Sequence, residues 1–369
     1  KMEISGKLLN TALQYSASPG LPELVQLFKE DTVAAHGVPI SSDWNILVST
    51  GSQDAIVKML DVVLNDGDSL LVENPTYPGT LAALKAMDIK LFGTEVDEHG
   101  MNVAALKSKL DGWEQNEDTR HASKPKVIYV IPTGQNPSGA TLSNARRTEL
   151  YQVAQAHDLL ILEDDPYWHL QLHPYKPTST TPPEAIKSLF SMDTDGRVVR
   201  FDSLSKVVSS GLRIGYATGP TQLIHHLEMV QQASSLHASG IAQAIVVQLL
   251  TSLGTEGWHA HVAQVQDFYT QRRNVFLEAC ETHLTGLAEW HAPVAGMFVW
   301  LKLVGIEDSS VLVKTKCAEA KVLAIPGEAC VVDNKPSPYI RCAFSTASDA
   351  DISEALRRLA TLLKQERNL

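Results

Sequence analysis

The sequence predicts an α/β fold in which a large domain, built on a mostly parallel sheet flanked by helices, precedes a smaller α+β domain. Over about the first 220 residues, short runs rich in β-branched and apolar residues alternate with longer amphipathic stretches. This alternation is typical of parallel strands joined by crossover helices. Several runs are apolar throughout, as expected of strands that helices cover on both faces.

The large domain is expected to contain six strands with helices between them. Helical patterns cover 52–66 and 144–158, for example, and each lies between two strand-like runs. The six expected strands are NILVST (45–50), DSLLVE (68–73), IKLFGTEV (89–96), PKVIYVIP (125–132), LLILEDD (159–165) and GRVVRFDS (196–203).

The pattern changes after about residue 220, where a long helical region begins. Shorter mixed strands and helices follow it, including GMFVWLKL and YIRCAFS. We therefore expect an N-terminal segment at 1–14, a large domain at 15–250 and a small C-terminal domain at 251–369. Two loops rich in Pro, Thr and charge, 112–125 and 172–185, are expected to be flexible.

Composition argues against several classes of function. The formal net charge of -11 gives no basic field for nucleic acid or an anionic membrane. The apolar runs are far shorter than the roughly 20 residues of a membrane span. The four cysteines form no CxxC pair, which favours a reduced, cytoplasmic chain. The chain starts at Lys1 without a secretory signal, and we expect the natural protein to begin earlier.

Polar residues directly after strand-like runs are the first candidates for a site, because ligands of open α/β sheets bind beyond the carboxyl ends of the strands. After the first run, Gly51 permits a tight turn, and Ser52 and Gln53 open a helix. Free amides at a helix N-terminus suit a phosphate, although ordinary N-capping explains the same residues. Asn136, before Pro137, presents an amide, or it only bonds its own loop.

The run LLILEDD ends in three acids, Glu163, Asp164 and Asp165. Carboxylates after a buried strand are costly unless they meet a cation or a protonated nitrogen. Metal binding with His169 and His173 is the weaker alternative, because these histidines lie in a strand-like or loop segment without a metal-binding pattern.

Lys206 follows the next strand-like run in an apolar setting. Burial lowers the pKa of a lysine and makes it an amine nucleophile or base. Ser203, Ser205 and Arg213 provide the donors that a phosphate ester needs. Arg341 lies inside an apolar strand and requires an anionic partner, either a substrate carboxylate or an acid of the protein.

Together these residues indicate a ligand with a phosphate, a basic nitrogen that can pair with an aspartate, and a carbonyl carbon that a lysine can attack. Pyridoxal 5'-phosphate has all three groups.

The order of these motifs resembles the PLP-dependent aminotransferases of fold type I, class I/II. More narrowly, it resembles the kynurenine/2-aminoadipate aminotransferases and the fungal aromatic aminotransferases, over essentially the whole chain. The resemblance is carried by ALQYSASPGLPEL, STGSQDA, PTGQNPSG, LEDDPYWHLQL, SMDTDGRVVRFDSLSKVVSSGLRIG, GLAEWHAPVAGMFVWLK and SPYIRCAFSTAS.

The resemblance implies a role for each candidate. Lys206 would be the Schiff-base lysine, and Asp164 would keep the pyridine nitrogen protonated. Asn136 and Tyr167 would bond the 3'-oxygen of the ring, and Tyr77 would stack on its face. Arg341, with Asn136, would bind the substrate carboxylate. The phosphate would be held by Ser52, Gln53, Ser203, Ser205 and Arg213, and by Tyr15 of a neighbouring subunit.

The resemblance thus implies a homodimer with shared sites and amino transfer to 2-oxoglutarate by a ping-pong mechanism. The donor stays open among aromatic amino acids, kynurenine and 2-aminoadipate. One departure matters, because the Gly-Gly-Leu/Ile-Pro arm that covers the substrate in the family does not occur before Tyr15.

Three other functions compete with an aminotransferase. A decarboxylase or lyase would use the same lysine and aspartate. A ligand-sensing domain of a regulator would need a DNA-binding segment, and the sequence contains none. A nucleotide-dependent dehydrogenase is disfavoured because no GxGxxG follows the early strands.

Overall fold

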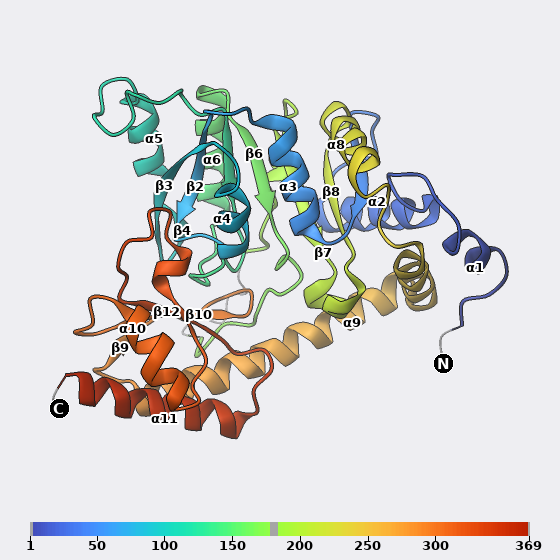
Figure 1. Ribbon diagram of the computed structural model, residues 1–369. Helices are drawn as coiled ribbons and strands as arrows, with labels where there is room; N and C mark the ends of the chain where they lie inside the picture. The colour runs from blue at the N-terminus through green and yellow to red at the C-terminus, as the bar shows by residue number, and fades with distance from the viewer. Residues whose placement is uncertain (1–2, 178–183, 368–369) are drawn as a thin grey trace.

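The computed structural model describes residues 3–177 and 184–367, arranged around two sheets (Figure 1). Part of the loop expected to be flexible at 172–185, namely 178–183, lies outside the described residues. The larger sheet has eight strands in the order β1-β8-β7-β6-β5-β2-β3-β4. They are β1 Trp44–Ser49, β2 Ser69–Asn74, β3 Lys90–Asp97, β4 Gly100–Met101, β5 Val127–Val130, β6 Leu160–Asp164, β7 Val198–Ser203 and β8 Gly215–Pro220.

The centre of this sheet is parallel, as the sequence predicts. Strand β2 pairs in parallel with β3 and β5, and β6 pairs in parallel with β5 and β7. The six expected strand runs correspond to β1, β2, β3, β5, β6 and β7. Two strands were not expected: β8 runs antiparallel between β1 and β7, and β4 forms a short antiparallel pair with β3.

Nine α-helices occur in the described residues up to position 283. Several begin at a side-chain cap, such as Asn102 before α5 and Ser143 before α6. Helix α3 contacts β1, β6, β7 and β8, and its first residue, Ser52, lies against Gly215 at the start of β8. The helices are α1 Gly6–Ala12, α2 Pro22–His36, α3 Ser52–Val63, α4 Pro78–Leu84, α5 Val103–Asp111, α6 Asn144–Ala156, α7 Leu189–Met192, α8 Thr221–Ser234 and α9 Gly240–His283.

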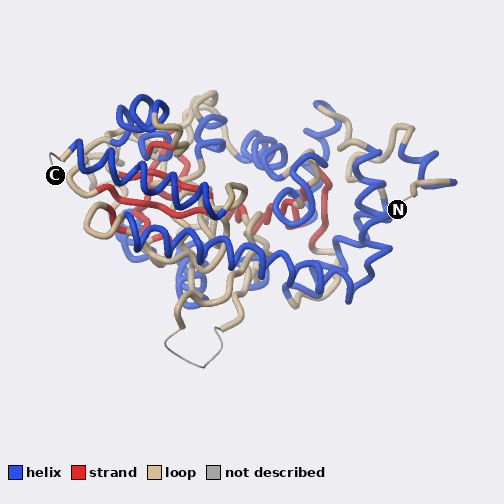
Figure 2. The backbone as a smooth tube through the Cα atoms, turned by 90° about the horizontal axis from the view of Figure 1, so that it is seen from below, coloured by secondary structure: helices blue, strands red, loops and turns tan. Residues whose placement is uncertain are grey.

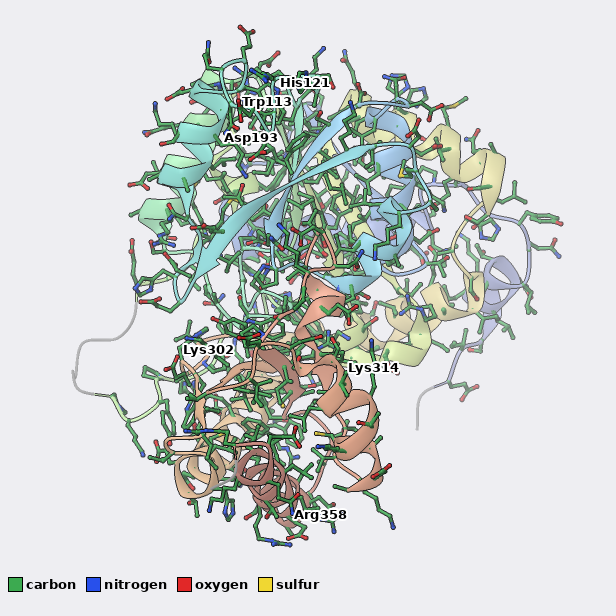
Figure 3. All side chains as sticks on the ribbon, turned by 60° about the vertical axis from the view of Figure 1, so that its left-hand side comes forward. Trp113, His121, Asp193, Lys302, Lys314 and Arg358 are labelled. Atoms are coloured by element: carbon green, nitrogen blue, oxygen red, sulfur yellow. The ribbon has the colours of Figure 1, made fainter. Side chains whose placement is uncertain are left out.

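The smaller sheet is antiparallel, with strands in the order β11-β12-β10-β9. Helices α10 Ser309–Leu312 and α11 Asp349–Glu366 accompany it, and α11 lies along α9 (Figure 2). The strands are β9 Ala288–Glu289, β10 Phe298–Leu303, β11 Ile325–Pro326 and β12 Tyr339–Ala343. Figure 3 labels Trp113, His121 and Asp193 around the large sheet and Lys302, Lys314 and Arg358 around the small one.

Helix α9 connects the two parts. It is interrupted at Gly254, whose φ of 63° is not helical. The domain boundary expected between residues 250 and 251 falls inside this helix, close to the interruption, and it stays a prediction. None of the helices in the described ranges is long and apolar enough to cross a membrane.

Candidate active site

The sequence candidates meet in one cavity of about 270 Å³ at the carboxyl ends of the central strands. Every predicted site residue except Tyr15 lines it, although these residues come from positions 52 to 341 of the chain. Three residues that sequence reasoning missed complete the wall: Ile131, Pro166 and Phe298. The predicted lining residues are Ser52, Gln53, Tyr77, Asn136, Asp164, Tyr167, Ser203, Ser205, Lys206, Arg213 and Arg341.

One end of the cavity is rich in hydrogen-bond donors. Ser52 is the first residue of α3, where backbone amides lack partners within the helix. The guanidinium of Arg213 donates to Ser205 Oγ over 3.2 Å and to the carbonyl of Thr50 over 3.2 Å. Positive charge and a helix N-terminus therefore lie together, which is the arrangement that binds a phosphate.

Two glycines allow this close approach. Gly51 has a φ of +83°, and a Cβ there would lie 2.3 Å from Nη2 of Arg213. A Cβ on Gly215 of β8 would lie 2.5 Å from the amide nitrogen of Ser52. Any larger residue at either position would separate the start of α3 from the loop that carries Arg213.

Asp164 forms another wall of the cavity at the end of β6. Its Oδ2 accepts a hydrogen bond of 2.5 Å from the hydroxyl of Tyr129. Its Oδ1 is buried and has no hydrogen-bond partner among the described residues. Burial raises the pKa of Asp164 to about 7, the Tyr129 hydrogen bond opposes that rise, and the charges of Asp165 and Asp202 add to it.

The unpaired Oδ1 of Asp164 shows whether the site fits the ring of the expected cofactor. A buried carboxylate oxygen without a donor is costly unless a ligand supplies one. A protonated pyridine nitrogen is such a donor, so the residues present fit the ring that the sequence analysis requires.

Lys206 lies in a single π-helical turn, Ser205–Ser209, directly after β7. Its side chain is half-buried and lines the same cavity as Asp164. Burial lowers the pKa of the Lys206 amine, and the cations Arg213 and Arg341 lower it further. A larger share of the amine is therefore neutral than in water, and the neutral form is the nucleophile and base.

Arg341 belongs to β12 of the small sheet. It lines the cavity together with residues that come from the large sheet. Its Nη1 donates to Asn136 Oδ1 over 2.8 Å, and its guanidinium lies 4.4 Å from the ring centre of Phe298. No ion pair joins Arg341 to a carboxylate in the residues that the structure describes. Of the two partners considered from the sequence, the geometry favours a carboxylate that comes from a ligand.

Tyrosines and an amide make up the remaining wall. Asn136 and Tyr167 are both 4 % exposed, and Tyr77 is half-buried at the start of α4. Burial raises the pKa values of the Tyr77 and Tyr167 phenols, so both hydroxyls keep their protons and can donate at neutral pH. Gly79 lies so close to the Tyr77 ring that a Cβ there would be 2.4 Å from its Cζ.

Tyr15 lies apart from this cavity. It follows α1, and its side chain is 85 % exposed. The expected place of Tyr15 is a neighbouring subunit's site, so its role stays a prediction.

The two other acids, Glu163 near the end of β6 and Asp165 just after it, have a protein partner that sequence reasoning missed. Arg200 of β7 is fully buried, and its guanidinium lies 2.8 Å from Asp165 and 3.3 Å from Glu163. The same guanidinium bonds both oxygens of Asp202, at 2.9 and 2.8 Å. The signal was present in RVVRF, where an arginine interrupts an apolar strand as Arg341 does.

The two histidines considered as metal ligands face different acids. His169 lies 3.8 Å from Asp31, and His173 lies 2.8 Å from Asp267. Glu163 and Asp165 lie beside Arg200 instead, and no group of three or more His, Cys, Asp or Glu side chains in the described ranges is arranged to hold a metal ion.

Comparisons with known proteins agree with one another. The family model described as aminotransferase class I and II matches residues 7–359. The mitochondrial kynurenine/alpha-aminoadipate aminotransferase of Mus musculus is 40% identical over 97% of this chain and 84% of its own.

Solved structures also match. The kynurenine aminotransferase of Pyrococcus horikoshii, in complex with PMP, has a TM-score of 0.88 and 30% identity over 98% of this chain and 84% of its own. The aromatic aminotransferase Aro9 of C. albicans has a TM-score of 0.89 and 29% identity over 98% of this chain and 82% of its own.

Proposed function

Because this chain belongs to the class I and II aminotransferases, we propose that it moves the amino group of kynurenine, 2-aminoadipate or an aromatic amino acid to 2-oxoglutarate. The cofactor is pyridoxal 5'-phosphate, and the two half-reactions follow a ping-pong order. One observation carries this proposal: a single cavity joins a half-buried lysine, a buried acid with a free oxygen and a set of phosphate donors.

Three parts of the site would hold the cofactor. Lys206 would meet its aldehyde, Asp164 Oδ1 would face its ring nitrogen, and the start of α3 with Arg213 would bind its phosphate. When bound, pyridoxal phosphate supplies a carbonyl carbon that amines attack and a ring that takes up negative charge. Asp164 favours a positive ring nitrogen through charge pairing in a buried site.

Lys206 is the residue that moves the proton of the substrate Cα. Burial and the nearby cations lower the pKa of the Lys206 amine, so a larger share of it would be neutral and able to accept the proton from the substrate Cα. The same amine would be the group that gives this proton back. The buried side chains of Tyr167 and Phe298 exclude water from this part of the cavity.

Arg341 holds the other end of the substrate. Its planar guanidinium offers paired donors, which suit the carboxylate that every α-amino acid carries. Kynurenine, 2-aminoadipate and aromatic amino acids share that carboxylate and differ in the side chain. The choice among them rests on the names of the relatives, which include all three classes.

Two further parts of the proposal concern assembly and location. We propose a homodimer in which Tyr15 reaches the partner's phosphate site, because this tyrosine is exposed on a single chain. We also propose a reducing compartment, the cytoplasm, because all four cysteines are free thiols and buried. The name of the mouse relative assigns that protein to mitochondria, so fractionation of cells that produce the full protein is the test.

The function is tested with a panel of amino donors against 2-oxoglutarate, using the cofactor-loaded protein. We expect glutamate to form with at least one of kynurenine, 2-aminoadipate, tyrosine or phenylalanine. Lys206→Ala should retain less than about a thousandth of the wild-type rate, because it lacks the group that moves the proton. A Lys206→Ala protein with full activity would overturn the mechanism.

A second measurement separates an aminotransferase from a decarboxylase or lyase. Mixed with an amino acid but no acceptor, an aminotransferase should release one equivalent of 2-oxo acid and then stop. Continuous turnover or release of carbon dioxide without an acceptor would identify one of the other reactions.

A further inference from the structure

Thr80, Tyr129 and Asp164 form a buried chain of hydrogen bonds behind the cavity. The hydroxyl of Thr80 in α4 donates to Tyr129 Oη over 3.1 Å, and Tyr129 in β5 donates to Asp164 Oδ2 over 2.5 Å. Thr80 and Tyr129 are both 0 % exposed, and Asp164 is 4 % exposed. Bulk water therefore does not reach the hydrogen bonds that join these three residues.

The direction of the chain is fixed by its chemistry. A tyrosine hydroxyl carries one proton, so it donates once. The Asp164 carboxylate can only accept, so the proton of Tyr129 points at it, and the hydroxyl of Thr80 donates to Tyr129 in turn. Hydrogen bonds in such a row polarise one another, so Thr80 strengthens the bond that Tyr129 makes.

This arrangement leaves the two oxygens of Asp164 in different states. Oδ2 is occupied by Tyr129, and Oδ1 is the oxygen without a partner. Burial is the largest influence on the pKa of Asp164, and it favours the protonated acid. The Tyr129 hydrogen bond is the strongest influence in the opposite direction, so it favours the carboxylate.

We propose that Tyr129 is a positioning residue for the amino-transfer reaction: its hydroxyl keeps Asp164 an anion with Oδ1 toward the ring nitrogen of the cofactor. The proposal rests on the proposed function, since Asp164 meets a ring nitrogen only there. Without the hydroxyl, the carboxylate becomes more basic and competes for the proton that it shares with the ring nitrogen. The ring nitrogen then loses positive charge, and removal of the substrate Cα proton becomes slower.

The test is Tyr129→Phe, which removes one oxygen from the cofactor-loaded enzyme. With ¹⁵N in the pyridine ring, the nitrogen NMR signal of the variant should move toward the position of an unprotonated ring. The kcat should fall by about 10- to 100-fold, as loss of a hydrogen bond to a charged group implies. The deuterium isotope effect from a Cα-deuterated donor should rise, and KM should change less than about threefold.

Two variants serve as controls. Tyr216→Phe removes a hydroxyl from another buried tyrosine, on β8, which stacks on Phe28 and lies outside the cavity. It should leave the nitrogen signal at the wild-type position. Thr80→Val removes only the first donor of the chain and should shift the signal in the same direction as Tyr129→Phe, but less.

The possible outcomes separate the role of Tyr129 from the proposed function. An active wild type with the same nitrogen signal and kcat in Tyr129→Phe overturns this inference and leaves the proposed function standing. A wild type that is inactive on every donor overturns the proposed function instead. If Tyr129→Phe does not fold, Thr80→Val carries the test, and an unchanged nitrogen signal in that variant contradicts the inference.

Discussion

Nη1 of Arg341 donates a hydrogen bond of 2.8 Å to Oδ1 of Asn136, although 205 positions separate the two residues in the chain. The contact joins the small sheet to the loop that follows β5 of the large sheet. Arg341 is thereby fixed over the cavity with the rest of its guanidinium free to meet an anion. This arrangement leads to a prediction about substrate choice.

Arg341→Ala should lower kcat/KM for α-amino acid donors by about 100- to 1,000-fold, because a carboxylate loses its paired charge-assisted donors. A primary amine without a carboxylate never uses those donors, so its slow half-reaction should change little. Single-turnover rates with both types of donor measure the effect. Equal losses for the two types would assign Arg341 a structural role.

Gly51→Ala should weaken the binding of pyridoxal phosphate by about 10- to 100-fold. The new Cβ would lie 2.3 Å from Nη2 of Arg213, so this guanidinium must leave the phosphate site. The measurement is an absorbance titration of the cofactor-free protein.

Gly67→Ala is the matched control for this substitution. Gly67 has a φ of +81°, close to the +83° of Gly51, but a Cβ at Gly67 would meet nothing within 4 Å. Both variants place an alanine at a positive φ, and only Gly51→Ala displaces Arg213. Identical cofactor affinities in the two variants would remove Arg213 from the set of phosphate ligands.

The central strands and most of the cavity were predictable from the sequence for a physical reason. Strands β5, β6 and β7 are covered on both faces, so their residues form apolar runs, and the polar residues after them must lie at one edge. Strand β8 was missed because GYATGP contains two glycines and a proline, and its place depends on pairing with β1 and β7.

Side-chain contacts between neighbouring strands leave no local pattern in the sequence. Tyr129 lies in the middle of an apolar run, and its bond to Asp164 depends on the parallel register of β5 and β6. Phe298 enters the cavity from β10, and only the pairing of β10 with β12 brings it near Arg341. A chain of several hundred residues does not reveal such pairs until the sheets are formed.

Arg200 supports the loops that end in the site, so its loss should affect stability first. Its guanidinium lies within 3.3 Å of Glu163 and within 2.8 Å of Asp165 and Asp202. Among the described residues, Arg200→Ala would leave Asp165 and Asp202 buried without a cation within 4 Å, and Glu163 with Arg147 alone, at 3.7 Å. The expected cost is about 3 to 5 kcal/mol. The urea midpoint of the cofactor-free protein measures this loss.

Arg357→Ala is the control for this change. Arg357 pairs with Glu354 on the exposed side of α11, where water screens the charges. Its urea midpoint should stay near that of the wild type. A similarly small change in Arg200→Ala would mean that the three acids are stabilised by something other than Arg200.

Glu73, in β2, should make the stability of the protein fall as the pH rises. Its side chain is fully buried, and this burial raises the pKa of Glu73 from 4.5 to about 8. Between these values the unfolded chain has released the proton and the folded chain still binds it, so each rise in pH favours unfolding. The loss through this group is about 1.4 kcal/mol per pH unit in that window and ends near pH 8.

Glu73→Gln should remove this dependence, because an amide resembles the protonated acid at every pH. Its oxygen can accept the bonds that Glu73 Oε2 receives from the Ile131 amide, at 2.9 Å, and from Gln135, at 3.3 Å. In urea unfolding of the cofactor-free protein, variant and wild type should be equally stable near pH 5, and the variant should be the more stable one at pH 8. Glu95→Gln, at an exposed site on the adjacent β3, should follow the wild type. A constant difference between Glu73→Gln and the wild type from pH 5 to pH 8 would show that Glu73 is already ionised in the folded protein over this range.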